Sequence, residues 1–140
     1  MKIVLVTTLG KEIIPSGIVS AVLTQTAEVA CDSLSIKIIG GKSLDEIERV
    51  YAYKNNKLIF NGYCDCQRTT ADERGFETYI YARSSACLLV DNDAFAYTYN
   101  RPSAQSLFDA YAKPFGFSYK LDDICTFKKY DVSSGSSLYG

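Results

Sequence analysis

Apolar and polar side chains alternate along several stretches of the chain, and a period of two is typical of β-strands with one buried face. The longest example follows Gly75, where Phe76, Thr78, Ile80 and Ala82 fall on one face of a predicted strand. Alternation, or a composition rich in β-branched residues, predicts further strands at residues 2–8, 18–26, 34–39, 50–53 and 58–63.

The segments between these strands carry signals of their own. A pair of asparagines at 55–56 predicts a tight β-hairpin, because asparagine tolerates the positive φ that such a turn requires. The polar segment 67–74 is predicted to be a loop. Ser43 and Glu46 have the spacing of a capping box, which predicts a short helical turn through Arg49.

One predicted strand runs directly into a predicted short helix at about residues 84–91. Ser84 or Ser85 can accept a hydrogen bond from the free N–H groups of a first helical turn. An apolar block at 87–90 follows, and the Asp-Asn-Asp cluster at 91–93 ends it.

A second, amphipathic helix is predicted at about residues 103–113, with Ser103 as its N-cap. Pro114 and Gly116 are typical of its end. The apolar positions of this helix recur at offsets of 0, 3, 4, 7 and 8 residues: Ala104, Leu107, Phe108, Tyr111 and Ala112.

Short extended segments are predicted on both sides of this helix. Residues 95–99 have the composition of a strand or of an extended connection. Residues 117–119 and 124–127 are predicted to be two short strands around a turn at Asp122-Asp123. Together the patterns predict a mainly β (α+β) protein.

Composition narrows the class of protein. A chain of 140 residues fits one domain, and 47% apolar with 22% charged residues is ordinary for a globular protein. The formal net charge of −1 and the scattered basic residues argue against nucleic-acid binding. No apolar run approaches the length of about 20 residues that spans a bilayer. The apolar amino terminus stops at Lys11-Glu12 with no small-residue cleavage site after it, so we interpret it as a first strand rather than a signal peptide. The five cysteines are irregularly spaced, which favours reduced thiols in a cytosol-made protein.

No motif predicts a catalytic residue, a cofactor site or a metal site. The chain has no histidine, the usual base for a serine or cysteine nucleophile. The segment 40–43 resembles part of a phosphate-binding loop, but Ile36 stands where that motif has its first glycine. Cys64 and Cys66 share a strand face, whereas a structural zinc site has about four ligands. We interpret them as buried or half-buried thiols.

Arg83 and Asp91 are the candidate structural residues of the strand–helix junction. The guanidinium fork of Arg83 can fix the junction by several hydrogen bonds, to Asp91 or to a carbonyl group of the short helix. The alternative is that Arg83 is a solvated surface group. The 11 tyrosines and 7 phenylalanines suit a sugar-binding face, but they are spread over both strand faces, which favours core packing and subunit contacts.

The order of these features resembles the amino-terminal part of the baseplate hub proteins of contractile phage tails, the late-control-D-like family that also occurs in prophages and phage-tail-like bacteriocins. Two departures are Ala82, where the family usually has glycine, and Leu88, where it usually has an acidic residue. The matching phrases are the strand end Ser33–Ile38, the hairpin end Leu58–Asp65 (similar to (F/L)-x-G-x-(I/V)-D), the joint Tyr79–Asp91 (similar to v-x-G-R-S-x-x-x-D-L-V-D) and the helix end Ala112–Gly116 (similar to ia-x-p-f-g).

The resemblance implies a tail-tube-like antiparallel β-barrel or sandwich over residues 1–131, with 132–140 as the start of a further segment. Leu138 and Tyr139 come just where a new element would begin, so we expect a fragment of a longer protein.

The implied function is that of a structural component of a phage-type tail baseplate hub, which connects the tail tube to the spike by ring-forming β-barrel domains. The implied partners are tail tube and spike proteins and further copies of the chain, since full-length hubs are trimeric. The implied location is the virion tail baseplate, after synthesis in the bacterial cytoplasm, and no enzymatic activity is implied. The alternative is a small β-rich module that recognises carbohydrate or a host surface.

Overall fold

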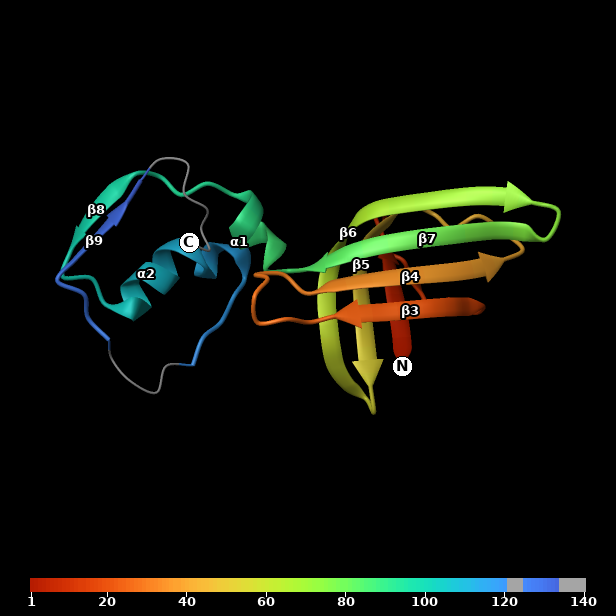
Figure 1. The fold of residues 1–140 in the computed structure, drawn as a ribbon, viewed down its shortest axis with the longest axis horizontal. Helices are drawn as coiled ribbons and strands as arrows, with labels where there is room; N and C mark the ends of the chain where they lie inside the picture. Colours follow the sequence, from red (N-terminus) through yellow and green to blue (C-terminus); the bar gives the residue numbers. More distant parts are fainter. Residues whose placement is uncertain (121–124, 134–140) are drawn as a thin grey trace. The chain divides into compact units, whose positions relative to one another are not determined.

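The computed structural model describes residues 1–120 and 125–133, and the chain divides into two compact units, Met1–Ala86 and Cys87–Gly140. The sequence-based boundary at residue 131 stays a prediction. The first unit contains β1 (Lys2–Thr7), β2 (Glu12–Ile13), β3 (Ile18–Thr24), β4 (Ser33–Gly40), β5 (Ile47–Lys54), β6 (Lys57–Asp72) and β7 (Gly75–Ser84) (Figure 1). The second contains α1 (Cys87–Asp91), β8 (Tyr97–Asn100), α2 (Ala104–Tyr111), the short 3₁₀-helix η1 (Lys113–Phe115) and β9 (Lys129–Val132).

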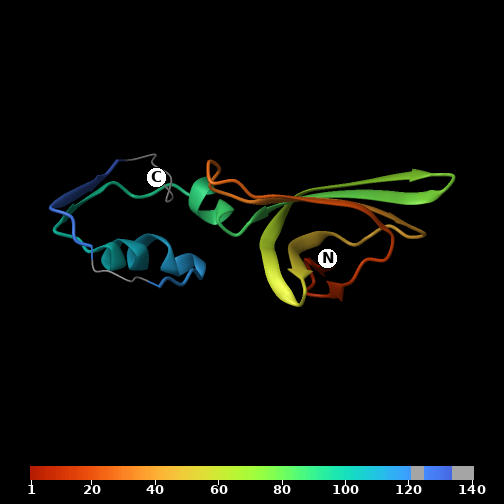
Figure 2. The same cartoon turned by 60° about the horizontal axis from the view of Figure 1, so that its bottom comes forward.

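The seven strands of the first unit form one sheet in the order β2-β1-β5-β6-β7-β4-β3, and every neighbouring pair is antiparallel. β6 belongs to both halves of this sheet, because its first part pairs with β5 and its second part pairs with β7. Its register shifts between Cys64 and Cys66, as at a β-bulge, and bulges bend strands. Figure 2 shows the first part of β6 curving away from the long hairpin that its second part forms with β7.

The core of this unit lies between the two halves of the sheet. One face of each half carries the buried side chains, and in β4 these are every second residue, as the alternation predicted. One half contributes Ile3, Leu5, Ile47, Val50, Ala52 and Phe60, and the other contributes Leu34, Ile36, Ile38, Ile80 and Ala82. The mainly antiparallel β class is thus confirmed. Within the described residues no pairing joins the end strands β2 and β3, so the sheet is open rather than closed into a barrel.

The predicted hairpin at the paired asparagines is confirmed. Asn55 and Asn56 lie between β5 and β6 with φ of 51° and 60°. Both values fall in the left-handed region that asparagine tolerates better than most residues. Lys54 and Lys57 pair directly across this turn.

Two predictions between the strands are wrong. Residues 43–46 form no helical turn, and β5 begins at Ile47, whose backbone N–H donates to the side chain of Gln67 at 2.8 Å. Residues 67–72 are not a loop but part of β6, since each pairs with a residue of β7. In both cases pairing within the sheet outweighs a local signal, as tertiary context commonly does.

Both predicted helices are present in the second unit. α1 begins at Cys87, three residues after its predicted start, because β7 continues to Ser84. The N-cap of α2 is confirmed, since the N–H of Ser106 donates to Ser103 Oγ at 3.0 Å. Gly116 ends the helical segment with φ of 82°.

The strands around α2 agree only in part with the predictions. β8 confirms a strand within the 95–99 region, and it pairs with β9. Residues 117–119 form no strand, and within 125–127 the pairing is a single bridge from Thr126 to Ser103. The turn at Asp122-Asp123, Ile124 and the segment containing Leu138 and Tyr139 lie outside the described residues. Among the described residues, no helix has the length and apolar character needed to cross a membrane.

Candidate functional site

β3 forms one edge of the seven-stranded sheet, and among the described residues its outer side pairs with no strand. Its seven residues, Ile-Val-Ser-Ala-Val-Leu-Thr, include no charged residue and no proline. Val19 and Val22 are 60% and 56% exposed. Edge strands of soluble proteins are usually shielded by charges, proline or short length, because an open edge is a template for pairing with another chain. β3 is therefore a candidate interaction surface.

β3 is held firmly at its start by Gly17. The N–H of Ile39 donates to the carbonyl oxygen of Gly17 at 2.9 Å. Gly17 has φ of 84°, and a Cβ at this position would lie 2.2 Å from the carbonyl oxygen of Ile39. Ala21 and Leu23 pack against the core from the inner face of the strand. The open edge thus belongs to a strand that packs against the core.

β2, the strand at the opposite edge of the sheet, is shielded. β2 has only two residues, one of which is Glu12, and Lys11 precedes it. The turn before β2 is closed by hydrogen bonds from Gly10 N–H to the carbonyl oxygen of Thr7 (2.8 Å) and from Lys11 N–H to Thr7 Oγ1 (3.1 Å). Leu9, at the tip of this turn, is 92% exposed but lies on no open edge.

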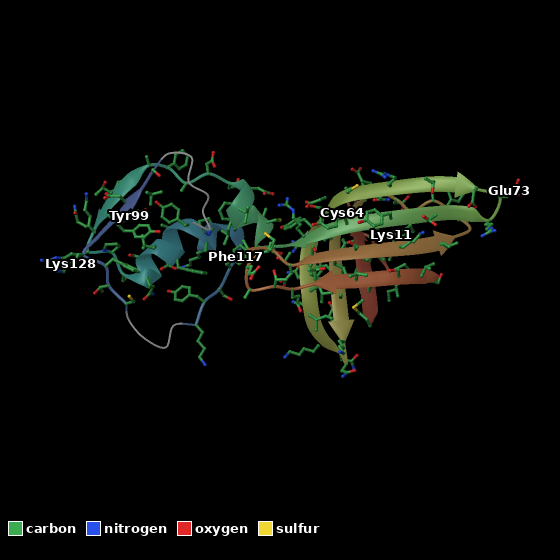
Figure 3. All side chains as sticks on the ribbon, viewed as in Figure 1. Lys11, Cys64, Glu73, Tyr99, Phe117 and Lys128 are labelled. Carbon is green, nitrogen blue, oxygen red and sulfur yellow. The ribbon has the colours of Figure 1, made fainter. Side chains whose placement is uncertain are left out.

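The second part of β6 provides another open edge. β5 pairs with β6 only as far as Tyr63, whereas β7 pairs with β6 to Asp72. Residues 68–72 are all exposed, and no strand lies on their second side within the described part of the chain. Glu73 lies at the tip of the hairpin (Figure 3).

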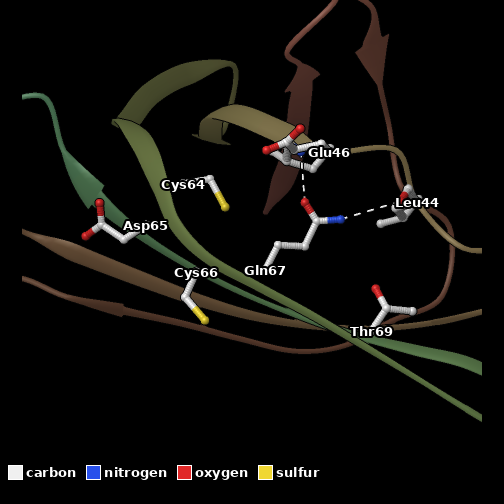
Figure 4. A pocket seen from close by; sticks show the side chains of 8 residues that line it. Leu44, Glu46, Cys64, Asp65, Cys66, Gln67 and Thr69 are labelled. Carbon is white, nitrogen blue, oxygen red and sulfur yellow. Dashed lines mark hydrogen bonds between the residues drawn. The ribbon is translucent and has the colours of Figure 1, made fainter.

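A pocket of about 400 Å³ lies where β5 leaves β6 (Figure 4). Gln67 bridges its two sides, because its Oε1 accepts from the N–H of Ile47 at 2.8 Å and its Nε2 donates to the carbonyl oxygen of Asp45 at 3.1 Å. Cys64 and Cys66 also line the pocket. This clamp holds the diverging strands together where the backbone ladder between them ends.

Cys64, one of the two thiols in this pocket, is poorly suited to nucleophilic chemistry. Both thiols are half-buried, as predicted, and burial raises the pKa of Cys64 to about 11. A thiol with that pKa is almost fully protonated near neutral pH, and the thiolate is the reactive form. Within residues 1–120 and 125–133, no group of three or more His, Cys, Asp and Glu side chains is placed to hold a metal ion.

Arg83 makes a pairing that the sequence did not predict. Its Nε donates to Oδ2 of Asp65, and its Nη2 lies 3.4 Å from Asp65 Oδ1. Asp65 lies in the bulge of β6 and Arg83 near the end of β7, so the ion pair fixes the bend of β6 against its neighbour. Asp91 is the last residue of α1 in the second unit, and its pairing with Arg83 stays a prediction.

The second unit has a group of aromatic side chains around β8. The rings of Tyr97 and Tyr99 lie 4.6 Å apart, and those of Tyr99 and Tyr111 lie 6.1 Å apart. Phe95 and Tyr97 are exposed. Figure 3 shows the position of Tyr99 in this unit. Exposed aromatic rings are the feature that the carbohydrate-binding alternative requires.

The open edges were not predicted from the sequence, although one signal was present. The segment 18–26 is the longest predicted strand without a charged residue, and such a strand is unusual at an exposed edge. Asp65 ends the segment Leu58–Asp65 that resembles the hub family, but the sequence did not indicate that it pairs with Arg83.

No family model and no curated protein matches the sequence. The solved structures that resemble the chain include two tail proteins. A 43 kDa tail protein of prophage MuSo2 from Shewanella oneidensis superposes with a TM-score of 0.80 at 19% identity, over 99% of this chain and 47% of that protein. A tail protein from Neisseria meningitidis MC58 superposes with a TM-score of 0.72 at 18% identity, over 98% of this chain and 42% of that protein. The chain spans less than half the length of either, and at this identity the likeness shows a shared fold.

Proposed function

We propose that the chain is a structural subunit of a phage-type tail, in the baseplate hub that connects the tail tube to the spike. The observation that carries the proposal is the unshielded edge of β3, in a fold shared with two tail proteins. A protein whose role is to form a ring needs such an edge, whereas a protein that works as a monomer is harmed by it.

The second edge supports ring formation. An interface between two different surfaces of the same chain is head-to-tail, and it forms a closed ring when the rotation between copies closes. β3 and residues 68–72 of β6 are two different open edges on one sheet. Pairing between them in successive copies would extend the sheet around a ring and leave neither edge exposed.

The proposed partners are further copies of this chain, with the tail tube on one side of the ring and the spike on the other. In hub proteins three chains with two tube-like domains each form a pseudo-sixfold ring, and we assign this chain to the first of these domains. The proposed location is the virion tail baseplate, after synthesis in the bacterial cytoplasm. The role requires no chemistry, so we expect no catalytic turnover.

Self-association tests this proposal. Val22→Lys places a charge on the open edge strand, and we expect it to weaken association roughly tenfold or more in sedimentation velocity, because lysine on an edge strand disfavours pairing with a further strand. Leu9→Lys is the matched control, since it places the same charge at a more exposed apolar position outside both edges. It should associate like the unmodified chain.

Two results would overturn the proposal. One is an unmodified chain that stays monomeric at the highest concentration at which it remains dissolved. The other is an association that Val22→Lys and Leu9→Lys weaken equally, because the contact would then not involve β3. Circular dichroism of both variants establishes that each has kept its fold.

A second candidate function, recognition of carbohydrate or a host surface, is favoured by the exposed rings of Phe95 and Tyr97. It predicts binding to a glycan array that Tyr97→Ala removes, without any effect on self-association. An unmodified chain that binds no glycan on the array would rule out its carbohydrate form.

A further inference from the structure

The proposed ring does not by itself define the relative orientation of neighbouring copies. The directions of the strands limit the possible orientations. Ile18 of β3 pairs with Ile38 near the end of β4, and Gly40 pairs with Phe76 near the start of β7. Asp72, the last residue of β6, pairs with Gly75. The start of β3 and the tip of the hairpin between β6 and β7 therefore lie at the same end of the four-stranded layer β6-β7-β4-β3.

Rotation about a ring axis keeps this end on the same side in every copy. Because neighbours alternate in direction across the layer, β3 of one copy and β6 of the next run in opposite directions. Their pairing continues the antiparallel pattern. The hairpin tip of one copy then lies beside the start of β3 in its neighbour.

A recess is present at the same end of the layer, and residues of β2, β4 and β7 line it together with the segment before β3. It has a volume of about 260 Å³ and opens beside the segment before β3 and the segment after β4. Ser16, Gly41 and Lys42 line it. Gly41 has no neighbour within 4 Å of the position where a Cβ would stand, so its backbone is open in that direction, whereas Gly75 of the hairpin in the same chain lies close to Gly40 and Gly41.

The charges at the two surfaces are opposite. Lys42 is exposed beside the recess, and Glu73 is exposed at the hairpin tip (Figure 3). Within the described residues neither makes an ion pair in its own chain. At the far end of β3 the exposed Glu28 and the half-buried Asp32 are acidic. The reversed orientation would therefore place Glu73 beside like charges, which disfavours it.

We propose that the β6–β7 hairpin tip of one copy docks against the start of β3 in the next copy, with Glu73 beside the neighbour's Lys42. This inference rests on the proposed ring and adds its orientation. The pair contributes direction rather than most of the affinity, because complementary charges at the rim of an interface mainly govern orientation and partner choice.

Charge reversal tests the inference in the full chain by sedimentation velocity at low salt. Lys42→Glu and Glu73→Lys should each weaken self-association about threefold to tenfold, because each brings like charges together. The double variant should recover most of the original association. High salt should reduce the difference between the single variants and the unmodified chain.

Lys57→Glu is the matched control, because Lys57 is an exposed lysine beside the β5–β6 turn, away from both edges. It changes the net charge as much as Lys42→Glu does, and it should leave association unchanged. If the double variant associates no better than the single variants while Val22→Lys still weakens association more than Leu9→Lys does, the orientation is wrong and the ring stands. If Val22→Lys also has no effect beyond that of Leu9→Lys, the proposed function itself fails.

Discussion

Replacing Arg83 with methionine should lower the free energy of unfolding of the first unit, because it breaks the ion pair with Asp65 and keeps most of the apolar stem. The pair joins the bulge of β6 to the end of β7. Without it, the Asp65 carboxylate is left partly desolvated, and the bend of β6 loses a tie to its neighbouring strand.

The magnitude follows from the exposure of the pair, since both side chains are 29% exposed. Fully exposed pairs contribute about 0.2–1 kcal/mol, and breaking a buried pair costs about 3–5 kcal/mol. A pair between these limits should contribute about 1–2 kcal/mol. For a unit of this size that corresponds to a decrease in Tm of about 4–16 °C.

Urea denaturation followed by circular dichroism measures the change, and a double-mutant cycle with Asp65→Asn isolates the pair. Lys37→Met is the control, because it breaks the Lys37–Glu77 ion pair on the neighbouring strands, which is 44% and 40% exposed. That variant should lose less than about 0.5 kcal/mol. A coupling energy below about 0.3 kcal/mol between Arg83 and Asp65 would refute the argument that their ion pair fixes the bend of β6 against β7.

Three further predictions concern the backbone, a thiol and a helix cap. Gly17→Ala should destabilise the protein by about 1 kcal/mol or more and exceed the effect of Gly10→Ala, since both have positive φ but only the first Cβ would clash with backbone; thermal unfolding measures this. The pKa of Cys64 is raised from 9.0 to about 11, so this thiol should have about 100-fold less thiolate at pH 8 than an unperturbed thiol. Mass spectrometry should therefore show that iodoacetamide labels Cys64 far more slowly than the exposed Cys125. Equal labelling rates would contradict the burial of Cys64. Ser103→Ala should cost about 1 kcal/mol and speed amide exchange in the first turn of α2, and unchanged exchange would show that the cap contributes nothing.

Local chemistry made some elements predictable. The Asn55-Asn56 turn follows from the tolerance of asparagine for positive φ, and the start of α2 follows from the hydroxyl of Ser103. Both signals depend on residues within a few positions of each other. The alternation in β4 was equally visible, because one face of the strand is buried and the other is not.

Partners distant in the sequence account for what was missed. The polar residues 67–72 were predicted to be a loop, but they form a strand because they pair with β7. The capping-box spacing of Ser43 and Glu46 was outweighed because Ile47 is buried in the sheet. The two open edges depend on the strand order, which no local pattern encodes.

The place of β6 in both halves of the sheet has a consequence for the order of folding. β5, β6 and β7 follow one another in the chain and pair in that order, so both hairpins close over short loops. β1 and β4 join the same sheet over much longer separations, as the pairs Lys2–Tyr53 and Gly40–Phe76 show. Contacts between distant segments form more slowly, so we expect the central meander to form first. β3 then enters the sheet with β4, so we expect the open edge of β3 to be completed only after the core has begun to close.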